Sequence, residues 1–264
     1  MPKNHTFTFM GTGAGCGVPA FFCECPACQE ARQNPRARRG DCGVMVRGQK
    51  TMLVDTPPDT RQQLIREGIH EIDQLLLTHC HSDHISGMCE MEYMVQLRTR
   101  CNLDVYCSDI TAAEVAREFH YMDYCLDFHC LEPFQTHEFD GVRYTALPVT
   151  HAPGTFGYLM ETPETSLFYA SDTGVLPDET KERIRGVDIL AMDATYWKSC
   201  PVPQSHHSVQ ECIEEGLALD AGTIYLTHLC MHYAEPVTLV ELEEYCNQYG
   251  GRVLPAADGL SFPL

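Results

Sequence analysis

Three histidines and one aspartate crowd into the run His79-Cys80-His81-Ser82-Asp83-His84. Imidazole nitrogens and carboxylate oxygens are ligands that Zn²⁺ and Mn²⁺ accept. The run follows Leu75-Leu76-Leu77, an apolar stretch typical of a buried β-strand. An extended backbone points alternate side chains to one face, so His79 and His81 are expected to share a face. Asp83 and His84 are expected in a tight turn that faces a second point, so this segment can serve two metal ions.

Three further candidate ligands end strand-like stretches later in the chain. They are His151 in Pro148-Val149-Thr150-His151, Asp172 in Tyr169-Ala170-Ser171-Asp172 and His228 in Tyr225-Leu226-Thr227-His228. A lone histidine at the end of a strand is more often structural. These residues therefore count as ligands only together with the run at 79–84.

A second cluster, Cys23-Glu24-Cys25-Pro26-Ala27-Cys28, offers three thiolates within a short segment. Structural zinc requires four ligands, usually in tetrahedral arrangement, so one ligand must come from elsewhere. His232 is the best candidate for it, and Cys230 is the alternative. A redox pair or chance clustering would also explain the cysteines.

The elements that must position these residues alternate between strands and helices. Strands are expected at 5–10, 43–47, 50–54, 75–77, 103–107, 142–149, 156–161, 167–170, 187–192 and 223–227, with closing strands at 252–254 and 260–262. Helices are expected at 59–67, 88–98, 178–185, 208–219 and 236–248, with helical stretches between 109 and 126. Strand-rich halves that each end in helices predict two packed sheets covered by helices.

Composition narrows the class of partner. The 264 residues include 18 Lys and Arg against 37 Asp and Glu, a formal net charge of −19. That balance argues against a nucleic-acid polymer, because backbone binding needs clustered cations. No apolar run of transmembrane length occurs, so no membrane association is expected. Fifteen cysteines without a secretory signal fit a reducing, cytoplasmic location better than a disulfide framework.

Together these motifs resemble the metallo-β-lactamase fold superfamily, and within it the PhnP-type cyclic phosphodiesterases of phosphonate breakdown. Besides the metal-ligand run and a cysteine insert at about 16–42, the resemblance rests on Gly17-Val18-Pro19-Ala20, Thr155-Phe156-Gly157-Tyr158-Leu159 and Ser171-Asp172-Thr173. It covers nearly the whole chain. PqqB-type proteins of quinone-cofactor synthesis share the cysteine insert. The resemblance implies an α/β (α+β) fold, an αββα four-layer sandwich, formed by one domain over 1–264.

The resemblance also implies the ligand sets. One metal would be held by His79, His81 and His151, the other by Asp83, His84 and His228, with Asp172 bridging the two. Asp55 would orient a ligand imidazole from behind, or else simply form a turn. Structural zinc would be held by Cys23, Cys25, Cys28 and His232. Relatives space their last two histidines as His-x-x-His, whereas this chain has His228-Leu229-Cys230-Met231-His232, one residue longer.

A general acid is implied near a late helix. His206 and His207 precede Ser208-Val209-Gln210-Glu211, a capping box that predicts a helix start. In the relatives a histidine here lies beside the substrate, and imidazole titrates near neutral pH. His206 is favoured over His207, and a structural role for both is the alternative. Asp83 and His206 are the two candidate catalytic residues.

The expected activity is that of a phosphoric diester hydrolase. Two divalent ions, Zn²⁺ or Mn²⁺, would hold a bridging hydroxide that attacks the phosphorus of a small anionic cyclic phosphodiester, such as a phosphoribosyl cyclic phosphate. The alternatives are a metal-dependent hydrolase of another ester class and a PqqB-like accessory protein of cofactor biosynthesis. The resemblance also suggests a homodimer.

Overall fold

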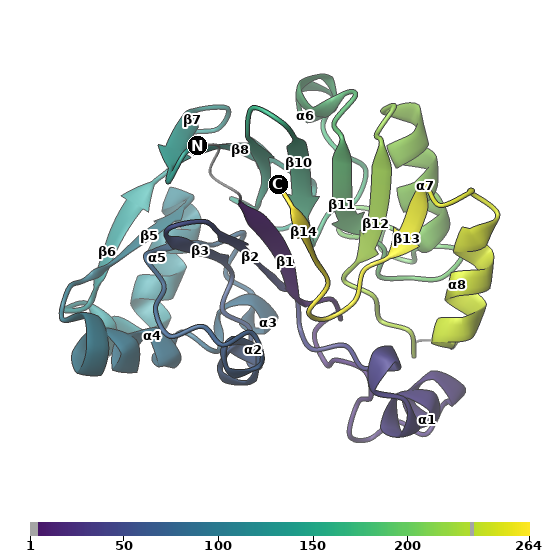
Figure 1. Cartoon of the computed structure of the whole chain (residues 1–264), viewed down its shortest axis with the longest axis horizontal. Coiled ribbons are helices and arrows are strands. Elements are labelled where there is room, and N and C mark those ends of the chain that lie inside the picture. Colours follow the sequence, from purple (N-terminus) through teal and green to yellow (C-terminus); the bar gives the residue numbers. More distant parts are fainter. Residues whose placement is uncertain (1–4, 233–234) are drawn as a thin grey trace.

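The computed structural model describes residues 5–232 and 235–264. Within these residues two seven-stranded sheets pack face to face (Figure 1). The order of the first sheet is β14 (Ser261–Pro263), β1 (Thr6–Gly11), β2 (Gly43–Arg47), β3 (Thr51–Val54), β4 (Gln74–Leu76), β5 (Leu103–Cys107), β6 (Leu126–Cys130). The order of the second is β13 (Val253–Pro255), β12 (Thr223–Thr227), β11 (Ile189–Asp193), β10 (Ser166–Ala170), β9 (Phe156–Glu161), β8 (Val142–Pro148), β7 (Thr136–Phe139).

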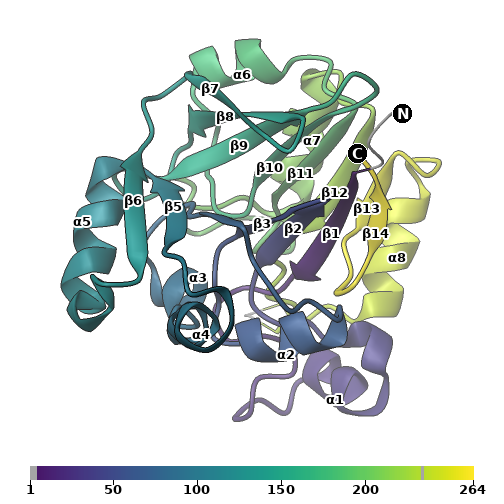
Figure 2. The same cartoon turned by 60° about the vertical axis from the view of Figure 1, so that its left-hand side comes forward.

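Helices cover the outer face of each sheet (Figure 2). Those of the first half are α2 (Thr60–Arg66), α3 (Ser82–Ile85), α4 (Cys89–Met94), the π-helical turn at Val95–Thr99, α5 (Asp109–Glu118) and the 3₁₀ turn at His120–Met122. Those of the second half are α6 (Asp178–Ile184), α7 (Val209–Ala218) and α8 (Leu239–Asn247). The four-layer αββα sandwich predicted from the sequence is therefore confirmed.

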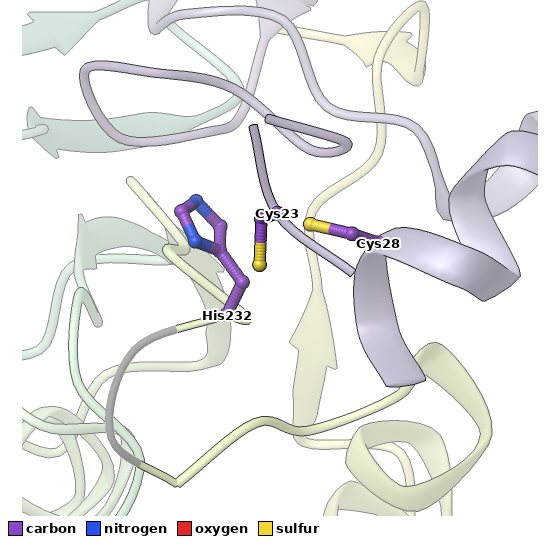
Figure 3. Close-up of side chains that lie close together, drawn as sticks. All are labelled: Cys23, Cys28 and His232. Atoms are coloured by element: carbon purple, nitrogen blue, oxygen red, sulfur yellow. The ribbon is translucent and has the colours of Figure 1, made fainter. Parts of the chain in front are cut away.

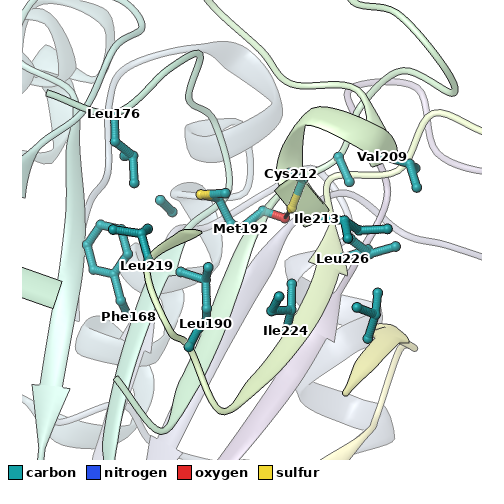
Figure 4. Close-up of a cluster of buried hydrophobic side chains, with 14 of the residues drawn as sticks. Phe168, Leu176, Leu190, Met192, Val209, Cys212, Ile213, Leu219, Ile224 and Leu226 are labelled. Carbon is teal, nitrogen blue, oxygen red and sulfur yellow. Dashed lines mark hydrogen bonds between the residues drawn. The ribbon is translucent and has the colours of Figure 1, made fainter. Parts of the chain in front are cut away.

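Alternation along the strands separates the layers of the core. In β10, Leu167 and Tyr169 pack between the two sheets, whereas Phe168 and Ala170 face the helices. Successive side chains of a strand point to opposite faces, so one apolar strand supplies two cores. Figure 4 shows the helix side of the second sheet, where Leu190 and Ile224 of the strands meet Cys212 and Ile213 of α7.

Strand direction gathers the polar residues at one edge. Strands β3 to β6 run parallel, as do β10 to β13, and β8 shares the direction of β10 because each is antiparallel to β9. The carboxyl ends of such strands are where α/β sheets bind ligands. Asp55, His79, His151, Asp172 and His228 all follow these ends.

The structure corrects several predicted boundaries. The helical stretches expected between 109 and 126 are α5 and a 3₁₀ turn, and strand β6 follows them. Strands β6 and β7 were not predicted because they are edge strands, whose largely exposed residues show little apolar alternation. The turn expected at Asp83 and His84 is the short helix α3. The cysteine insert contains an unpredicted helix, α1 (Pro26–Gln33), and a 3₁₀ turn at Pro35–Ala37.

Membrane-spanning helices are not found in the described part of the chain, where each helix is too short or too polar to cross a bilayer.

Candidate metal centre

The histidines and aspartates predicted as ligands converge at the edge where the strands end. Donor atoms of His79, His81 and His151 lie within 4.8 Å of one another, and so do those of Asp83, His84 and His228. Asp172 joins His79 and His84 in a third such group. Its carboxylate also lies 3.3 Å from His228 Nε2. Asp172 therefore stands between the two predicted sets, as a bridging ligand must.

Unpaired buried atoms indicate that this centre fits metal ions. The Nε2 atoms of His79, His84 and His228 and Oδ2 of Asp172 are buried without a hydrogen-bond partner. His84 Nε2 and Asp172 Oδ2 are 3.0 Å apart but do not meet in hydrogen-bond geometry. Buried polar atoms are normally paired, so a group of convergent unpaired atoms requires an explanation. Imidazole and carboxylate donors suit divalent cations such as Zn²⁺ and Mn²⁺.

Hydrogen bonds behind the centre fix the ligand imidazoles. His84 Nδ1 lies 2.8 Å from Asp55 Oδ2, and Asp55 also accepts from Thr78. His228 Nδ1 lies 2.8 Å from Thr195 Oγ1, and His151 Nδ1 lies 2.8 Å from the carbonyl oxygen of Ser205. Such contacts orient a ring so that its other nitrogen faces the metal.

Two residues of the site have strained backbone conformations. Asp55 and His228 adopt left-handed conformations, with φ of 64° and 53°. This conformation costs residues other than glycine about 1–2 kcal/mol. Both side chains are buried and hydrogen-bonded, so the surrounding structure holds the strained geometry in place.

The buried carboxylates and imidazoles of the centre shift one another's pKa values. Burial alone would raise the pKa of Asp172, but His228 and His84 hold it well below its usual value. Burial alone would lower the pKa of His228, but Asp172 and Asp83 raise it to about 9. Burial, reinforced by His84, lowers the pKa of His79, which is therefore a neutral donor. Metal binding would displace the protons on His84 and His228, so affinity is expected to fall as pH falls.

His206 faces the centre, and His207 does not. His206 Nδ1 lies 2.7 Å from Asp193 Oδ2, and its ring centroid lies 5.0 Å from that of His151 and 5.4 Å from that of His228. His207 is buried, with Nδ1 2.7 Å from the Thr173 carbonyl oxygen and Nε2 2.8 Å from Glu215. This geometry favours His206 as the general acid.

Asp193 and Thr195 belong to the site but were not predicted from the sequence. Asp193 is fully buried at the end of β11 and accepts hydrogen bonds from the Thr173 amide and from Thr195. Its donor atom lies within 4.8 Å of those of Asp172, His206 and His228. Its position in the sequence could have indicated this role. Asp193 is the last residue of a strand, and Asp172 and His228 closely follow the ends of two other strands.

The His207–Glu215 pair predicts a pH-dependent contribution to stability. Burial lowers the pKa of His207, but Glu215 outweighs it and the net pKa lies above 6.5. Burial raises the pKa of Glu215, but His207 and Lys181 hold it below 4.5. The histidine's contribution is complete below pH 6.5 and is lost as pH rises through the higher folded pKa. The glutamate's contribution is complete above pH 4.5 and is lost as pH falls through the lower folded pKa.

Replacing Glu215 with glutamine is therefore expected to lower the free energy of unfolding most between about pH 4.5 and 6.5. A loss of about 3 kcal/mol is expected there, as for other broken buried pairs. Urea unfolding of wild type and variant across pH measures it, with the exposed Glu214→Gln as control. A loss that stays constant with pH would show that the pair does not titrate as described.

The cysteine cluster also assembles. Sulfur atoms of Cys23 and Cys28 lie within 4.8 Å of each other and of a His232 ring nitrogen (Figure 3). Cys25, the third predicted thiol, is not part of this group of donor atoms. Cys16, not predicted, places its sulfur 3.2 Å from His232 Nε2. His232 therefore lies beside two of the three predicted thiols, those of Cys23 and Cys28.

The pKa values of two of these thiols, Cys28 and Cys23, are shifted in opposite directions. Burial raises the pKa of Cys28 to about 12. The backbone amide of Cys25 lowers the pKa of Cys23. Because thiolates are the metal ligands, zinc binding here would release protons and stabilise the fold.

Replacing Cys28 with serine is expected to remove one zinc ion per chain. The free energy of unfolding should fall by about 3 kcal/mol or more, because the metal and a fully buried thiol are both lost. Elemental analysis and thermal unfolding measure these effects, with the exposed Cys101→Ser as matched control. Unchanged zinc content in Cys28→Ser would contradict the structural zinc site.

Comparison with known proteins places the chain in a family. The model of the beta-lactamase superfamily domain matches residues 50–229. Coenzyme PQQ synthesis protein B of Methylococcus capsulatus is 27% identical over 229 residues, which cover 72% of this chain and 73% of that protein. An octanoyltransferase of Porphyromonas gingivalis is 32% identical over 116 residues, 43% of this chain, and the match spans only 22% of the octanoyltransferase.

Two solved structures superpose on nearly the full length of this chain. A diphosphatase of the PhnP family superposes with a TM-score of 0.86 at 29% identity, covering 100% of this chain and 98% of the other. Zn²⁺-bound PqqB from Methylobacterium extorquens superposes with a TM-score of 0.80 at 21% identity, covering 98% and 100%. With the two packed sheets and the matched domain, these findings establish that the chain belongs to the beta-lactamase superfamily domain family and has the metallo-β-lactamase fold.

Proposed function

We propose that this protein is a binuclear metal-dependent phosphodiesterase that hydrolyses a small cyclic phosphodiester, such as a cyclic phosphate on ribose. The observation that carries the proposal is the position of Asp172 between two complete ligand groups, with a histidine beside them. The similar diphosphatase of the PhnP family supports phosphorus chemistry.

In this proposal His79, His81 and His151 hold one divalent ion, and Asp83, His84 and His228 hold the other, with Asp172 shared. Zn²⁺ and Mn²⁺ both suit these donors. Such ions supply activation of a water molecule and neutralisation of charge on the phosphoryl oxygens. Asp83 acts at the centre through its carboxylate, which lies 3.6 Å from His228 Nε2 and 3.5 Å from His84 Nε2.

His206 provides the proton for the leaving oxygen. Asp193 holds Nδ1 of the ring at 2.7 Å, which leaves Nε2 directed away from that carboxylate. A carboxylate bound to one ring nitrogen fixes the orientation of a histidine. The ring is only partly buried, so a substrate oxygen can reach it.

The charge of the chain limits the substrate to a small molecule. A net charge of −19 would repel a polyanion over a large surface, whereas the field of bound cations acts only near the centre. A small anionic diester is therefore the proposed partner, and a nucleic-acid polymer is not. The cytoplasm is the proposed location and a homodimer the proposed assembly.

A PqqB-like accessory role is the second candidate, favoured by the sequence similarity to coenzyme PQQ synthesis protein B. The complete ligand set argues for catalysis instead, because an accessory protein has no need to keep two paired metal sites and a positioned general acid.

A panel of model substrates tests the proposed reaction class. We expect metal-loaded protein to hydrolyse a five-membered cyclic phosphodiester and bis(p-nitrophenyl) phosphate, and not a thioester or a β-lactam. Steady-state rates on these four compounds separate the classes. Cleavage of the thioester or lactam without cleavage of either diester would assign a different ester class, and no cleavage at all would favour the accessory role.

A further inference from the structure

The loop at 13–17 lies between the cysteine cluster and the metal centre. The thiol sulfur of Cys16 lies 3.2 Å from Nε2 of His232, the candidate imidazole ligand of the cysteine cluster. The preceding residue, Gly15, packs against the metal centre so closely that a methyl group on its Cα would lie 3.0 Å from Oδ2 of Asp83. Two consecutive residues of the loop therefore meet one candidate ligand of each site.

Hydrogen bonds hold this loop to the segment that joins the two sites along the chain. Only three residues separate His228 of the metal centre from His232 of the cysteine cluster. In this segment the amide of Leu229, which is buried, donates to the carbonyl oxygen of Thr12 at 2.9 Å. The amide of Ala14 donates in turn to the carbonyl oxygen of Leu229 at 3.3 Å. The loop and the segment are thus paired along their backbones, and a shift of one would displace the other.

The contact between Cys16 and His232 is of the kind that orients a metal-bound imidazole. A histidine that binds a metal ion through one ring nitrogen usually donates a hydrogen bond from the other. If Nε2 of His232 donates to the sulfur of Cys16, Nδ1 remains for the ion. The predicted set of three thiolates and one imidazole completes a tetrahedral site without Cys16. Cys16 is therefore better suited to hold His232 than to bind the ion itself.

We propose that Cys16 is a positioning residue that couples the zinc site to the metal centre. Its sulfur holds His232 in the orientation that binds zinc, and its loop holds Asp83 at the metal centre. Because both sites depend on one loop, an ion bound at either site is expected to raise the affinity of the other site for its ion. Neither contact involves the substrate, so the coupling is independent of the proposed phosphodiesterase reaction.

Cobalt absorption tests the contact at the cysteine cluster. Co²⁺ bound to thiolates gives an intense charge-transfer band, and the candidate ligands of the metal centre include no sulfur, so the band reports the cysteine cluster alone. In titrations of chelated protein, Cys16→Ala is expected to raise the Co²⁺ dissociation constant about ten-fold or more. Cys16→Ser should restore part of the affinity, because a hydroxyl oxygen accepts the same hydrogen bond. An unchanged Co²⁺ dissociation constant in Cys16→Ala would overturn the proposal.

Manganese binding tests the connection to the metal centre. Mn²⁺ prefers nitrogen and oxygen donors to thiolates, so protein whose cysteine cluster already holds zinc can be titrated with Mn²⁺ at the metal centre. Electron paramagnetic resonance measures the free ion. Asp83 belongs to one of the two ligand groups, so the weaker of the two Mn²⁺ dissociation constants is expected to rise about five-fold or more in Cys16→Ala. Wild-type Mn²⁺ affinity in this variant would contradict the coupling.

Cys101→Ser is the matched control. Cys101 is exposed and precedes β5, at the opposite end of that strand from the metal centre, so both dissociation constants should remain those of wild type. Circular dichroism verifies that each variant is folded. These measurements are also separate from the test of the proposed function, because they require no hydrolysis. Weaker Co²⁺ and Mn²⁺ binding by Cys16→Ala would support the coupling even if the wild-type protein cleaved no phosphodiester.

Discussion

Replacing Asp172 with asparagine is expected to lower phosphodiesterase kcat/KM by about 10³-fold or more. The substitution keeps the volume of the side chain and removes the charge that lies between His84 and His228. Bound cations supply several kcal/mol of charge stabilisation in such reactions, and each 1.4 kcal/mol is ten-fold in rate. Elemental analysis of the same variant should show fewer than two ions at this centre.

The exposed Asp188→Asn is the matched control, because Asp188 accepts hydrogen bonds from Ser166 far from the metal centre. Circular dichroism of both variants verifies that the fold is retained. Wild-type activity in folded Asp172→Asn would exclude a bridging role for this carboxylate.

Replacing His206 with alanine is expected to lower activity in proportion to the basicity of the leaving group. General acid catalysis typically contributes about 10²- to 10⁴-fold, so an alkyl or sugar leaving group should lose that factor. The weakly basic p-nitrophenolate needs little protonation and should lose only several-fold. Rates across a series of diesters of graded leaving-group pKa measure the effect as a steeper dependence on pKa.

His129→Ala is the control for this series, since His129 is exposed and pairs with Asp104 on the outer part of the first sheet. Its dependence on leaving-group pKa should match that of wild type. A His206→Ala variant with the wild-type slope and a uniformly lower rate would assign His206 to positioning instead of proton transfer.

The layered fold could be predicted because its central strands and long helices have regular patterns. Strands such as Leu103–Cys107 alternate buried and half-buried residues, and Ser208 and Glu211 form the capping box seen in the sequence. The alternation of apolar and polar residues does not predict a strand in which few residues are buried. Only Leu126 is buried in β6, so no alternation of apolar and polar residues indicates this strand in the sequence.

The ligands could be predicted because each follows a strand end, which fixes its position before any side-chain contact forms. The contacts that surround the ligands could not be predicted from the sequence. Asp193 has no histidine next to it in the sequence, and its contact with His206 is formed by the packing of a loop against β11. Cys16 lies outside the Cys-x-Cys-x-x-Cys spacing, and only the fold brings it to His232.

The choice between His206 and His207 likewise depends on packing. Both precede the same helix, and the sequence treats them as nearly equivalent. The glutamate at position 215 of α7 binds His207 in the interior, which leaves its neighbour toward the metal centre. A partner that lies eight positions along the chain is not part of a local motif.

Metal content measured together with activity is the decisive test of a binuclear phosphodiesterase. Chelated protein is titrated with Zn²⁺ or Mn²⁺ while bis(p-nitrophenyl) phosphate hydrolysis and bound metal are measured on the same samples. We expect activity to rise until two ions per chain are bound at the centre, and the total to approach three when the cysteine site is filled with zinc. Full activity with one ion or none at the centre, or full occupancy with no phosphodiester hydrolysis, would contradict a binuclear phosphodiesterase.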